Sequence, residues 1–300
     1  MKGTELSALQ SGSILADRYV IGNIAGEGGF GITYTAFDTQ IDRRVAVKEY
    51  FPKGAAVRGI DGITLEPISK RFSEDFSLGI ERILKETKIL TELRAQTDVI
   101  NIYDAFAQNG TVYYVMEYID GLSLDKYISR FGKLNSGQAI NAAEKIAYTL
   151  EKINAKNIIH RDISPENIII THSGDVKLVD FGNARPFSFD SGNSLTVALK
   201  QGYAPLEQYQ RHGDQGPWTD IYSLGAVLYY ALTAKDPQPP MNRLQDDIDF
   251  QVGLSSAEPE IAAVIKKMTA IKPRERYQSC SELLTDIKRI EIEHQDFSKS

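Results

Sequence analysis

Residues 160–167 read His-Arg-Asp-Ile-Ser-Pro-Glu-Asn, and the tripeptide Asp180-Phe181-Gly182 begins thirteen positions after Asn167. In this pattern Asp162 can accept a hydroxyl proton, while Asn167 and Asp180 can hold a divalent metal. Phosphoryl transfer from a nucleotide needs such groups, because its catalysis consists mostly of positioning and charge neutralisation. The two stretches therefore predict a phosphoryl-transfer site.

The sequence before these stretches predicts a small β-rich lobe. A polar, irregular lead-in occupies residues 1–17, and residues 50–75 show no clear period and predict an irregular connector. Apolar residues at helical spacing predict one main helix over 80–93. Strand-like runs lie at 19–25, 32–38, 44–49, 101–107 and 111–118. The last two are joined by Asn109-Gly110, a typical hairpin turn.

From residue 122 the pattern becomes mostly helical. Two short β-like runs, 168–171 and 176–179, flank a turn at Gly174-Asp175. Helices are predicted at 140–153, 221–232, 258–269 and 281–293, the second of them apolar on all sides. We therefore predict an α+β, bilobal fold with an N-lobe over 18–116, a hinge over 117–121, a C-lobe over 122–292 and a tail over 293–300.

Composition excludes several classes of protein. The net charge of −6 gives no drive toward nucleic acid or an anionic membrane. The single cysteine, Cys280, excludes an internal disulfide and predicts a structural thiol. We find no apolar signal region and no apolar stretch of the roughly 20 residues that a membrane-spanning helix needs. These observations predict a cytoplasmic, reducing location and no membrane segment in this chain.

Gly26-Glu27-Gly28-Gly29-Phe30-Gly31 is a G-x-G-x-x-G pattern, which alone is weak because dinucleotide-binding folds share it. Those folds need a helix after the third glycine, whereas the residues that follow here alternate like a strand. A strand–turn–strand with bare backbone at its tip suits a flap over nucleotide phosphates. The alternative is an ordinary flexible hairpin turn.

Lys48 ends the apolar run Val45-Ala46-Val47. An ammonium in such a strand needs an anionic partner, because an unpaired buried charge is very costly. Glu86 is the preferred candidate, since it leads into the apolar pattern of the following helix, and Glu81 is the rival. We expect Lys48 to hold nucleotide phosphates while Glu86 holds Lys48.

These motifs occur in the order and spacing of protein kinases, and the chain resembles that family over residues 18–292. It is most similar to bacterial Ser/Thr kinases of the eukaryotic-like, Hanks type. Lys48-Glu49-Tyr50-Phe51-Pro52 and the segment 202–209, Gly-Tyr-Ala-Pro-Leu-Glu-Gln-Tyr, are typical of that subgroup. The resemblance implies the bilobal kinase fold.

The resemblance also implies residue roles. Asp162 would orient or deprotonate the acceptor hydroxyl, and Asn167 and Asp180 would hold Mg²⁺, with Mn²⁺ as an alternative. Further residues would contact ATP: Gly26, Gly28 and Gly31 at the phosphates, Met116 as gatekeeper, Glu117 and Ile119 through hinge backbone groups, Ala46 and Ile169 on the adenine faces, and Ser123 at the ribose.

Two structural contacts are implied as well. Glu207 would pair with Arg276, and Asp220 would brace the catalytic loop from the start of the apolar helix. Thr33 stands where the family commonly has a valine over the adenine, and we expect this difference to have little effect on nucleotide binding. Leu206 replaces a common proline, yet Glu207 is retained and its ion pair is expected to survive.

Ser164 is a sharper departure, because the family commonly has a lysine there that neutralises charge on the transferring phosphoryl group. Losing such a donor costs about 10²–10³ in rate. Lys200 falls where a threonine facing the catalytic aspartate is common. Our hypothesis is that Lys200 supplies the missing cation near Asp162; the alternative is a solvated or substrate-facing loop lysine.

Arg161 is expected to need an anion. In the family such an arginine commonly binds a phosphorylated activation-loop residue, and Thr196 lies eleven residues before Glu207, where that site usually falls. Phosphorylation of Thr196 is therefore expected to order the loop through Arg161. The alternatives are Ser188, Ser191 and Ser194.

The sequence thus predicts an Mg-ATP-dependent Ser/Thr protein kinase that autophosphorylates its activation loop. Its expected partners are a protein with a Ser or Thr acceptor and a second copy for trans-autophosphorylation, with no nucleic acid. The alternatives are a nucleotide-binding pseudokinase, supported only by Ser164, and a kinase of small molecules, disfavoured by the segment 202–209. Such kinases often continue into a linker, membrane helix or sensor domain, so the chain can be part of a longer protein.

Overall fold

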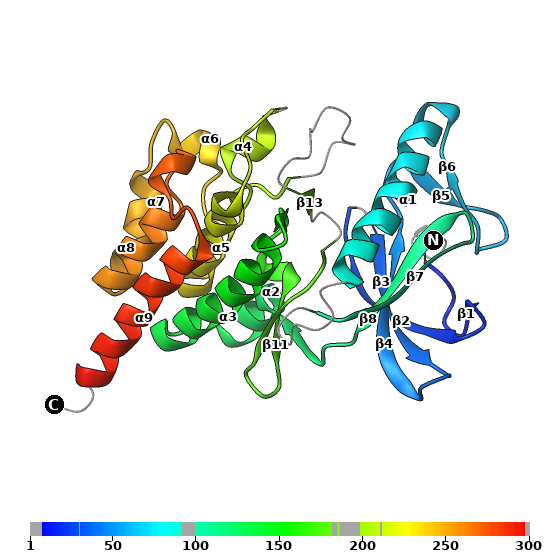
Figure 1. Ribbon diagram of the computed structural model, residues 1–300, viewed down its shortest axis with the longest axis horizontal. Helices are drawn as coiled ribbons and strands as arrows, with labels where there is room; N and C mark the ends of the chain where they lie inside the picture. Colours follow the sequence, from blue (N-terminus) through cyan, green and yellow to red (C-terminus); the bar gives the residue numbers. More distant parts are fainter. Residues whose placement is uncertain are drawn as a thin grey trace. The chain divides into compact units, whose positions relative to one another are not determined.

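The computed structural model describes residues 8–29, 31–91, 100–181, 185–186, 199–210 and 212–297, with the backbone alone for 82, 85–91, 185–186 and 291–297. It divides into two compact units, Met1–Tyr118 and Ile119–Ser300. The first is a β-sheet with one main helix and the second is mostly helical (Figure 1). The predicted α+β architecture is confirmed.

The first unit is built on an antiparallel sheet of six strands. Its order is β1 (Ile14–Leu15), β2 (Tyr19–Glu27), β3 (Gly31–Asp38), β4 (Arg43–Tyr50), β8 (Thr111–Glu117) and β7 (Ile102–Gln108). Asn109 and Gly110 join β7 to β8 with φ of 53° and 74°. Two successive residues in the left-handed region are what a type I′ hairpin requires, so the predicted turn is present.

Helix α1 (Lys70–Thr91) packs against β7 and β8. It begins ten residues before the predicted start at residue 80. The reason is Phe76, which is buried one turn before Ile80 and extends the apolar face toward the N-terminus. Ser73 and Gly79, which are poor helix formers, hide this turn in the sequence.

The stretch 50–75 is more ordered than predicted. It contains a two-stranded sheet of β5 (Ala56–Arg58) and β6 (Leu65–Pro67). The loop between them closes on Asp61, whose carboxylate accepts the backbone N–H groups of Ile63 and Thr64, both at 2.9 Å. The order comes from such specific polar contacts, which leave no period in the sequence.

The predicted irregular lead-in is also partly ordered. β1 pairs with β2 through Ile14 opposite Val20 and Leu15 opposite Tyr19. Leu9 and Leu15 are buried in the core of this unit. The segment therefore supplies the strand at one edge of the sheet.

The second unit is formed mostly by helices. These are α2 (Leu124–Phe131), α3 (Ser136–Asn154), α4 (Leu206–Tyr209), α5 (Pro217–Thr233), α6 (Pro240–Arg243), α7 (Ile248–Gly253), α8 (Pro259–Met268) and α9 (Cys280–Phe297). The strands are β9 (Gly121–Ser123), β10 (Ile158–Ile159), β11 (Ile168–Thr171), β12 (Val176–Leu178) and β13 (Arg185–Pro186). They form the sheets β12-β11-β9 and β10-β13.

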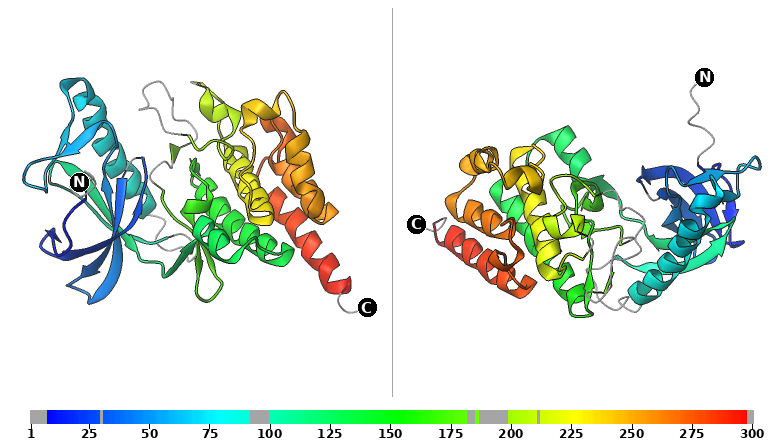
Figure 2. Two further views of the ribbon diagram at one scale, coloured as in Figure 1. Left: turned by 180° about the vertical axis from the view of Figure 1, so that it is seen from behind. Right: turned by 90° about the horizontal axis from the view of Figure 1, so that it is seen from above.

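Helix α5 lies at the centre of this unit, packed against α3 and α8 (Figure 2). Thirteen of its residues are buried, as its uniformly apolar sequence predicts. A side chain at Gly225 would come within 2.7 Å of Met268 Cβ, so this glycine lets α8 approach closely. Cys280 is buried, which raises the pKa of its thiol and fits a structural role. None of the helices in the described ranges is long and apolar enough to cross a membrane.

Candidate active site

In the first unit, strand β4 positions Lys48 beside the glycine-rich turn. Lys48 is paired with Thr33 on β3 and with Tyr114 on β8. A Cβ at Gly31 would lie 2.3 Å from the Glu49 carbonyl oxygen and 3.4 Å from Lys48 Cε. Only glycine permits this approach, which brings the turn to the lysine.

The turn itself has open backbone. The Gly28 N–H donates to the Gly31 carbonyl at 2.9 Å. A Cβ at Gly26 or Gly28 would have no described atom within 4 Å. The free space beside Gly26 and Gly28 leaves room for phosphate oxygens to approach the turn.

Two contacts tie this turn to the segment after β4. The Lys53 N–H donates to the Gly29 carbonyl at 2.9 Å, and Lys53 Nζ lies 3.1 Å from the carboxylate of Glu27. Both side chains are partly exposed. Sequence reasoning missed this contact, because Lys53 lies in the stretch that was predicted to be irregular.

The choice between Glu86 and Glu81 as the partner of Lys48 stays a prediction. Glu86 lies in α1, but its side chain is outside the described atoms. Glu81, the rival, is exposed on the same helix. Exposure makes Glu81 the poorer partner for a lysine that is half-buried.

The residues expected around adenine occur as directly opposed strand pairs within each unit. Ala46 on β4 faces Met116 on β8, and both are buried. In the second unit Ile169 on β11 faces Ser123 on β9. The Glu117 N–H already donates to the Asn101 carbonyl at 2.8 Å, so its C=O is the hinge group that Glu117 can offer.

The catalytic loop of the second unit is held from behind by Asp220. Its carboxylate accepts the N–H of His160 at 2.7 Å and the N–H of Arg161 at 2.8 Å. Burial raises the pKa of Asp220 to about 6, although the two backbone donors act in the opposite direction. Arg161 has φ of 68°, a left-handed conformation that these bonds help to maintain.

The loop is also fixed on the side of Asp162 that leads to Asn167. Asn167 Nδ2 donates to the Asp162 carbonyl at 2.8 Å, and the Asn167 carbonyl accepts the Val179 N–H at 2.8 Å. The second bond ties Val179, the residue just before Asp180, to Asn167. The Phe181 ring meets the His160 ring edge-on, with centroids 4.6 Å apart. The structure thus brings Asp162, Asn167 and Asp180 together on one framework.

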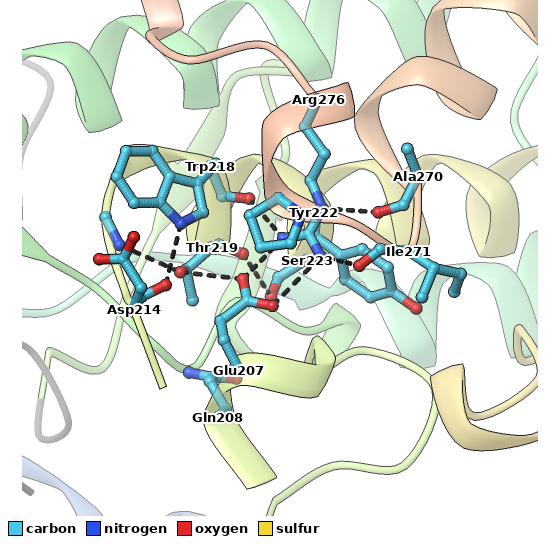
Figure 3. Close-up of polar contacts among 12 residues, drawn as sticks. Glu207, Gln208, Asp214, Trp218, Thr219, Tyr222, Ser223, Ala270, Ile271 and Arg276 are labelled. Atoms are coloured by element: carbon cyan, nitrogen blue, oxygen red, sulfur yellow. Dashed lines mark hydrogen bonds and ion pairs between the residues drawn. The ribbon is translucent and has the colours of Figure 1, made fainter. Parts of the chain in front are cut away.

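The segment 199–209 is anchored by the ion pair predicted for Glu207 and Arg276. Arg276 Nη1 lies 2.6 Å from Glu207 Oε1, and both side chains are buried. The guanidinium also donates to the carbonyls of Ala270, Ile271 and Trp218 at 2.7, 2.9 and 3.1 Å (Figure 3). The replacement of a proline by Leu206 leaves this pair intact.

Lys200, in the same segment, reaches the catalytic loop. Its Nζ donates to Ser164 Oγ at 3.1 Å and is ion-paired with Glu166. Lys200 and Asp162 line the same small pocket, together with Arg161, Ile163, Leu199, Tyr203, Ala204 and Ser223. Glu166 was missed from the sequence, although its place two residues after Ser164 was a usable signal.

Four predicted phosphorylation candidates cannot be located. Thr196 and its alternatives Ser188, Ser191 and Ser194 lie outside the described residues. Arg161, their expected partner, lies beside the described segment 199–209, because Gln208 Nε2 donates to the Arg161 carbonyl at 3.0 Å. The contact of Arg161 with a phosphorylated residue stays a prediction.

Comparison with known proteins shows the family of this chain. The protein kinase domain model matches residues 19–287. Serine/threonine-protein kinase PrkC of Bacillus subtilis is 29% identical over an alignment of 285 positions, which covers 92% of this chain and 41% of the relative. Serine/threonine-protein kinase PknB of Mycobacterium tuberculosis is 32% identical over an alignment of 303 positions, which covers 93% of this chain and 44% of the relative. This chain therefore spans less than half the length of these curated relatives.

A solved structure extends the match to three dimensions. The structure described as the PpkA-294 apo form superposes with a TM-score of 0.80 at 30% identity, covering 94% of this chain and 99% of that one. The predicted resemblance to bacterial Ser/Thr kinases is confirmed by these relatives. With the domain model matched over most of its length, this chain belongs to the protein kinase family.

Proposed function

We propose that this chain transfers the γ-phosphoryl group of ATP to a Ser or Thr hydroxyl of a protein. The observation that carries the proposal is the bracing of Asp162. Asp220 accepts the two N–H groups just before it, and Asn167 donates to its carbonyl. A backbone held on both sides keeps the Asp162 carboxylate in one place, as a proton acceptor requires.

The reaction assigns a simple part to each group. The acceptor oxygen forms a bond to the γ-phosphorus while the bond from that phosphorus to the β–γ bridging oxygen breaks. ADP leaves with the electron pair of that bond, and the hydroxyl proton passes to Asp162. Lys48 and the backbone of Gly26, Gly28 and Gly31 hold the nucleotide phosphates.

Residues of both units are proposed to bind the nucleoside. From the first unit these are Ala46, Met116 and Glu117, and from the second unit Ile119, Ser123 and Ile169. The apolar side chains pack on the adenine ring, and the hinge backbone and the Ser123 hydroxyl supply the polar contacts.

Asn167 and Asp180 fit the binding of Mg²⁺, with Mn²⁺ as an alternative. An amide oxygen and a carboxylate are hard oxygen donors, and Mg²⁺ usually takes one or two carboxylates together with substrate phosphates. The described residues contain no group of three or more His, Cys, Asp and Glu side chains that could hold a metal ion. When bound, the metal neutralises charge on the phosphates.

The acceptor is proposed to be a protein segment, which the loop 202–209 can support. Glu207 anchors that loop on Arg276, so it offers a fixed surface to an extended peptide. We also propose that the enzyme phosphorylates its own activation segment, at Thr196 or at Ser188, Ser191 or Ser194, and that a second copy is the acceptor in that step. A phosphate there would bind Arg161.

Transfer from labelled ATP tests the proposal. The wild type with Mg²⁺ or Mn²⁺ is expected to label itself and a generic Ser/Thr protein substrate, with label mapped to residues 187–198. Asp162→Asn is expected to lose at least about 10³-fold in kcat while it still binds ADP, because it keeps the shape but not the proton acceptor. A wild type that binds nucleotide but transfers no label with either metal would instead be a pseudokinase.

A further inference from the structure

Lys200 and Ser164 form a contact between two loops that lie 36 residues apart in the chain. Lys200 Nζ donates to Ser164 Oγ at 3.1 Å, and the same ammonium is paired with the Glu166 carboxylate. Ser164 is fully buried, whereas the Lys200 side chain is 31% exposed. The ammonium thus rests on the catalytic loop without being sealed from solvent.

The backbone of Lys200 is held in place. Its carbonyl accepts the N–H groups of Tyr203 at 3.1 Å and Ala204 at 3.0 Å, which closes a tight turn. In that turn Gly202 has φ of 86°, and a Cβ there would lie 2.3 Å from the Pro237 carbonyl oxygen. The Tyr203 hydroxyl donates to Asp236 at 2.6 Å. A lysine on such a turn is aimed by the fold and is not a freely solvated side chain.

The Lys200 side chain points toward the region where the phosphoryl group reacts. Lys200 and Asp162 line one pocket, and Ser164 is only two residues beyond Asp162. The hydroxyl that gives its proton to Asp162 attacks the phosphoryl group, so that group must come close to the same pocket. A cation fixed there acts where negative charge is concentrated in the transition state, and such charges contribute strongly to catalysis.

Ser164 makes this placement possible. Its side chain is small and neutral, so it leaves room for the ammonium and offers an oxygen that accepts its hydrogen bond. A second lysine at position 164 would repel Lys200. The exposed Glu166, at 61% exposure, gives only a weak, screened attraction that an arriving phosphoryl group can replace.

We propose that Lys200 is a catalytic residue whose ammonium stabilises the negative charge of the γ-phosphoryl group during its transfer, and that Ser164 holds the ammonium in readiness. The inference rests on the proposed function. As the acceptor oxygen bonds to phosphorus, the β–γ bridging oxygen leaves with ADP and the proton passes to Asp162. Lys200 keeps its proton throughout and contributes only charge and a hydrogen bond.

Four variants test the role: Lys200→Ala, Lys200→Arg, the double change Ser164→Lys with Lys200→Thr, and Lys266→Ala as a control at an exposed lysine on α8. For each, kcat and the KM for ATP are measured on a Ser/Thr protein substrate, with ADP affinity by calorimetry and melting temperature as checks on the fold. Lys200→Ala is expected to lower kcat about 10²–10³-fold, with ADP affinity changed less than about threefold.

The double change discriminates a catalytic role from a structural one. Returning the cation to the catalytic loop at position 164 is expected to raise kcat at least about tenfold above Lys200→Ala, and Lys200→Arg is expected to keep an intermediate rate. Lys266→Ala is expected to match the wild type.

Two results would overturn the inference. One is a folded Lys200→Ala with kcat within about threefold of the wild type. The other is a folded, ADP-binding double variant that is no faster than Lys200→Ala. If Lys200→Ala does not melt cooperatively, Lys200→Arg and the double variant are each compared with the wild type instead. The inference is then overturned if Lys200→Arg is within about threefold of the wild type in kcat while the folded, ADP-binding double variant is inactive. An inactive wild type would refute the proposed function, whereas an active wild type with indifferent Lys200 variants refutes this inference alone.

Discussion

The two units use similar contacts to hold a lysine beside a functional element. Each contains a buried Arg–Glu ion pair that anchors a loop, and each loop presents a partly exposed lysine to a functional element. In the first unit Arg58 pairs with Glu49, and the segment between these two residues brings Lys53 to the glycine-rich turn. In the second unit Arg276 pairs with Glu207, and the loop brings Lys200 to the catalytic loop.

The pairs differ in which partner receives the additional hydrogen bonds. At Glu49 the carboxylate is surrounded by donors: Arg58 binds it at 2.6 and 2.7 Å, and the hydroxyls of Tyr34 and Tyr113 donate at 2.9 and 2.7 Å. At Arg276 it is the guanidinium that has the extra partners, three backbone carbonyls. Arg58 also donates to the Ile63 carbonyl at 2.9 Å, and Glu207 also accepts the Thr219 hydroxyl, so the surplus hydrogen bonds fall mostly on the anion in the first pair and mostly on the cation in the second.

The two pairs therefore differ in how many polar groups lose a hydrogen-bond partner when the arginine is removed. If Arg58 is removed, Glu49 keeps two hydroxyl donors, although the Ile63 carbonyl loses a donor. If Arg276 is removed, Glu207 keeps the Thr219 hydroxyl at 3.1 Å, but three carbonyls also lose a donor, two of them in the loop after α8 and one in the first turn of α5. Breaking a buried pair is costly because it leaves a charge without compensation.

The largest expected effect is therefore that of Arg276→Leu. We expect it to lower the free energy of unfolding by about 3–5 kcal/mol and to abolish protein phosphorylation, because the segment 199–209 loses its anchor. Chemical denaturation and the transfer assay measure the two effects. A loss below about 1 kcal/mol would show that the pair is not needed as an anchor.

Arg58→Leu sharpens the comparison at intermediate size. We expect a loss of about 2–3 kcal/mol, smaller than for Arg276→Leu, because the tyrosine hydroxyls still satisfy Glu49. The double variant Arg58→Leu with Glu49→Gln removes the charge as well and is expected to recover part of the stability. If the double variant is less stable than Arg58→Leu, or Arg58→Leu is costlier than Arg276→Leu, the proposed role of the tyrosines is wrong.

The sequence predicted one pair and not the other for a physical reason. Glu207 and Arg276 belong to a recognisable pattern, so a contact between residues 69 positions apart could be named in advance. Arg58 lies in a stretch without periodicity, where order comes from a few polar contacts. Glu49 follows Lys48 in a strand, so the two side chains point to opposite faces, and the sequence had no signal for which buried donors Glu49 would meet.

The catalytic loop shows the same limit within one motif. Asp220 as the brace and the placement of Lys200 near Asp162 could be anticipated, because the resemblance to protein kinases implies where both residues lie. The ion pair of Lys200 with Glu166 was not predicted, because the position of Glu166 two residues after Ser164 does not by itself decide which carboxylate a partly exposed ammonium meets. Loops whose backbone is set by tertiary contacts are therefore where sequence patterns predict least.

The smallest expected effect concerns Lys53, the counterpart of Lys200 in the first unit. Its N–H bond to Gly29 is independent of the side chain, so Lys53→Ala removes only the ion pair with Glu27. An exposed pair is worth about 0.2–1 kcal/mol, which predicts a rise of about 1.4–5-fold in the KM for ATP at low salt with kcat unchanged. The difference is expected to shrink at high ionic strength, because salt screens exposed charges. The charge exchange Lys53→Glu with Glu27→Lys is expected to restore KM, and Lys70→Ala, at an exposed lysine of α1, serves as the control. Were Lys53→Ala to reduce kcat as strongly as Lys200→Ala, the two lysines would be equivalent in role, and the distinction between a lysine that steadies the turn and one that acts on the reacting group would fail.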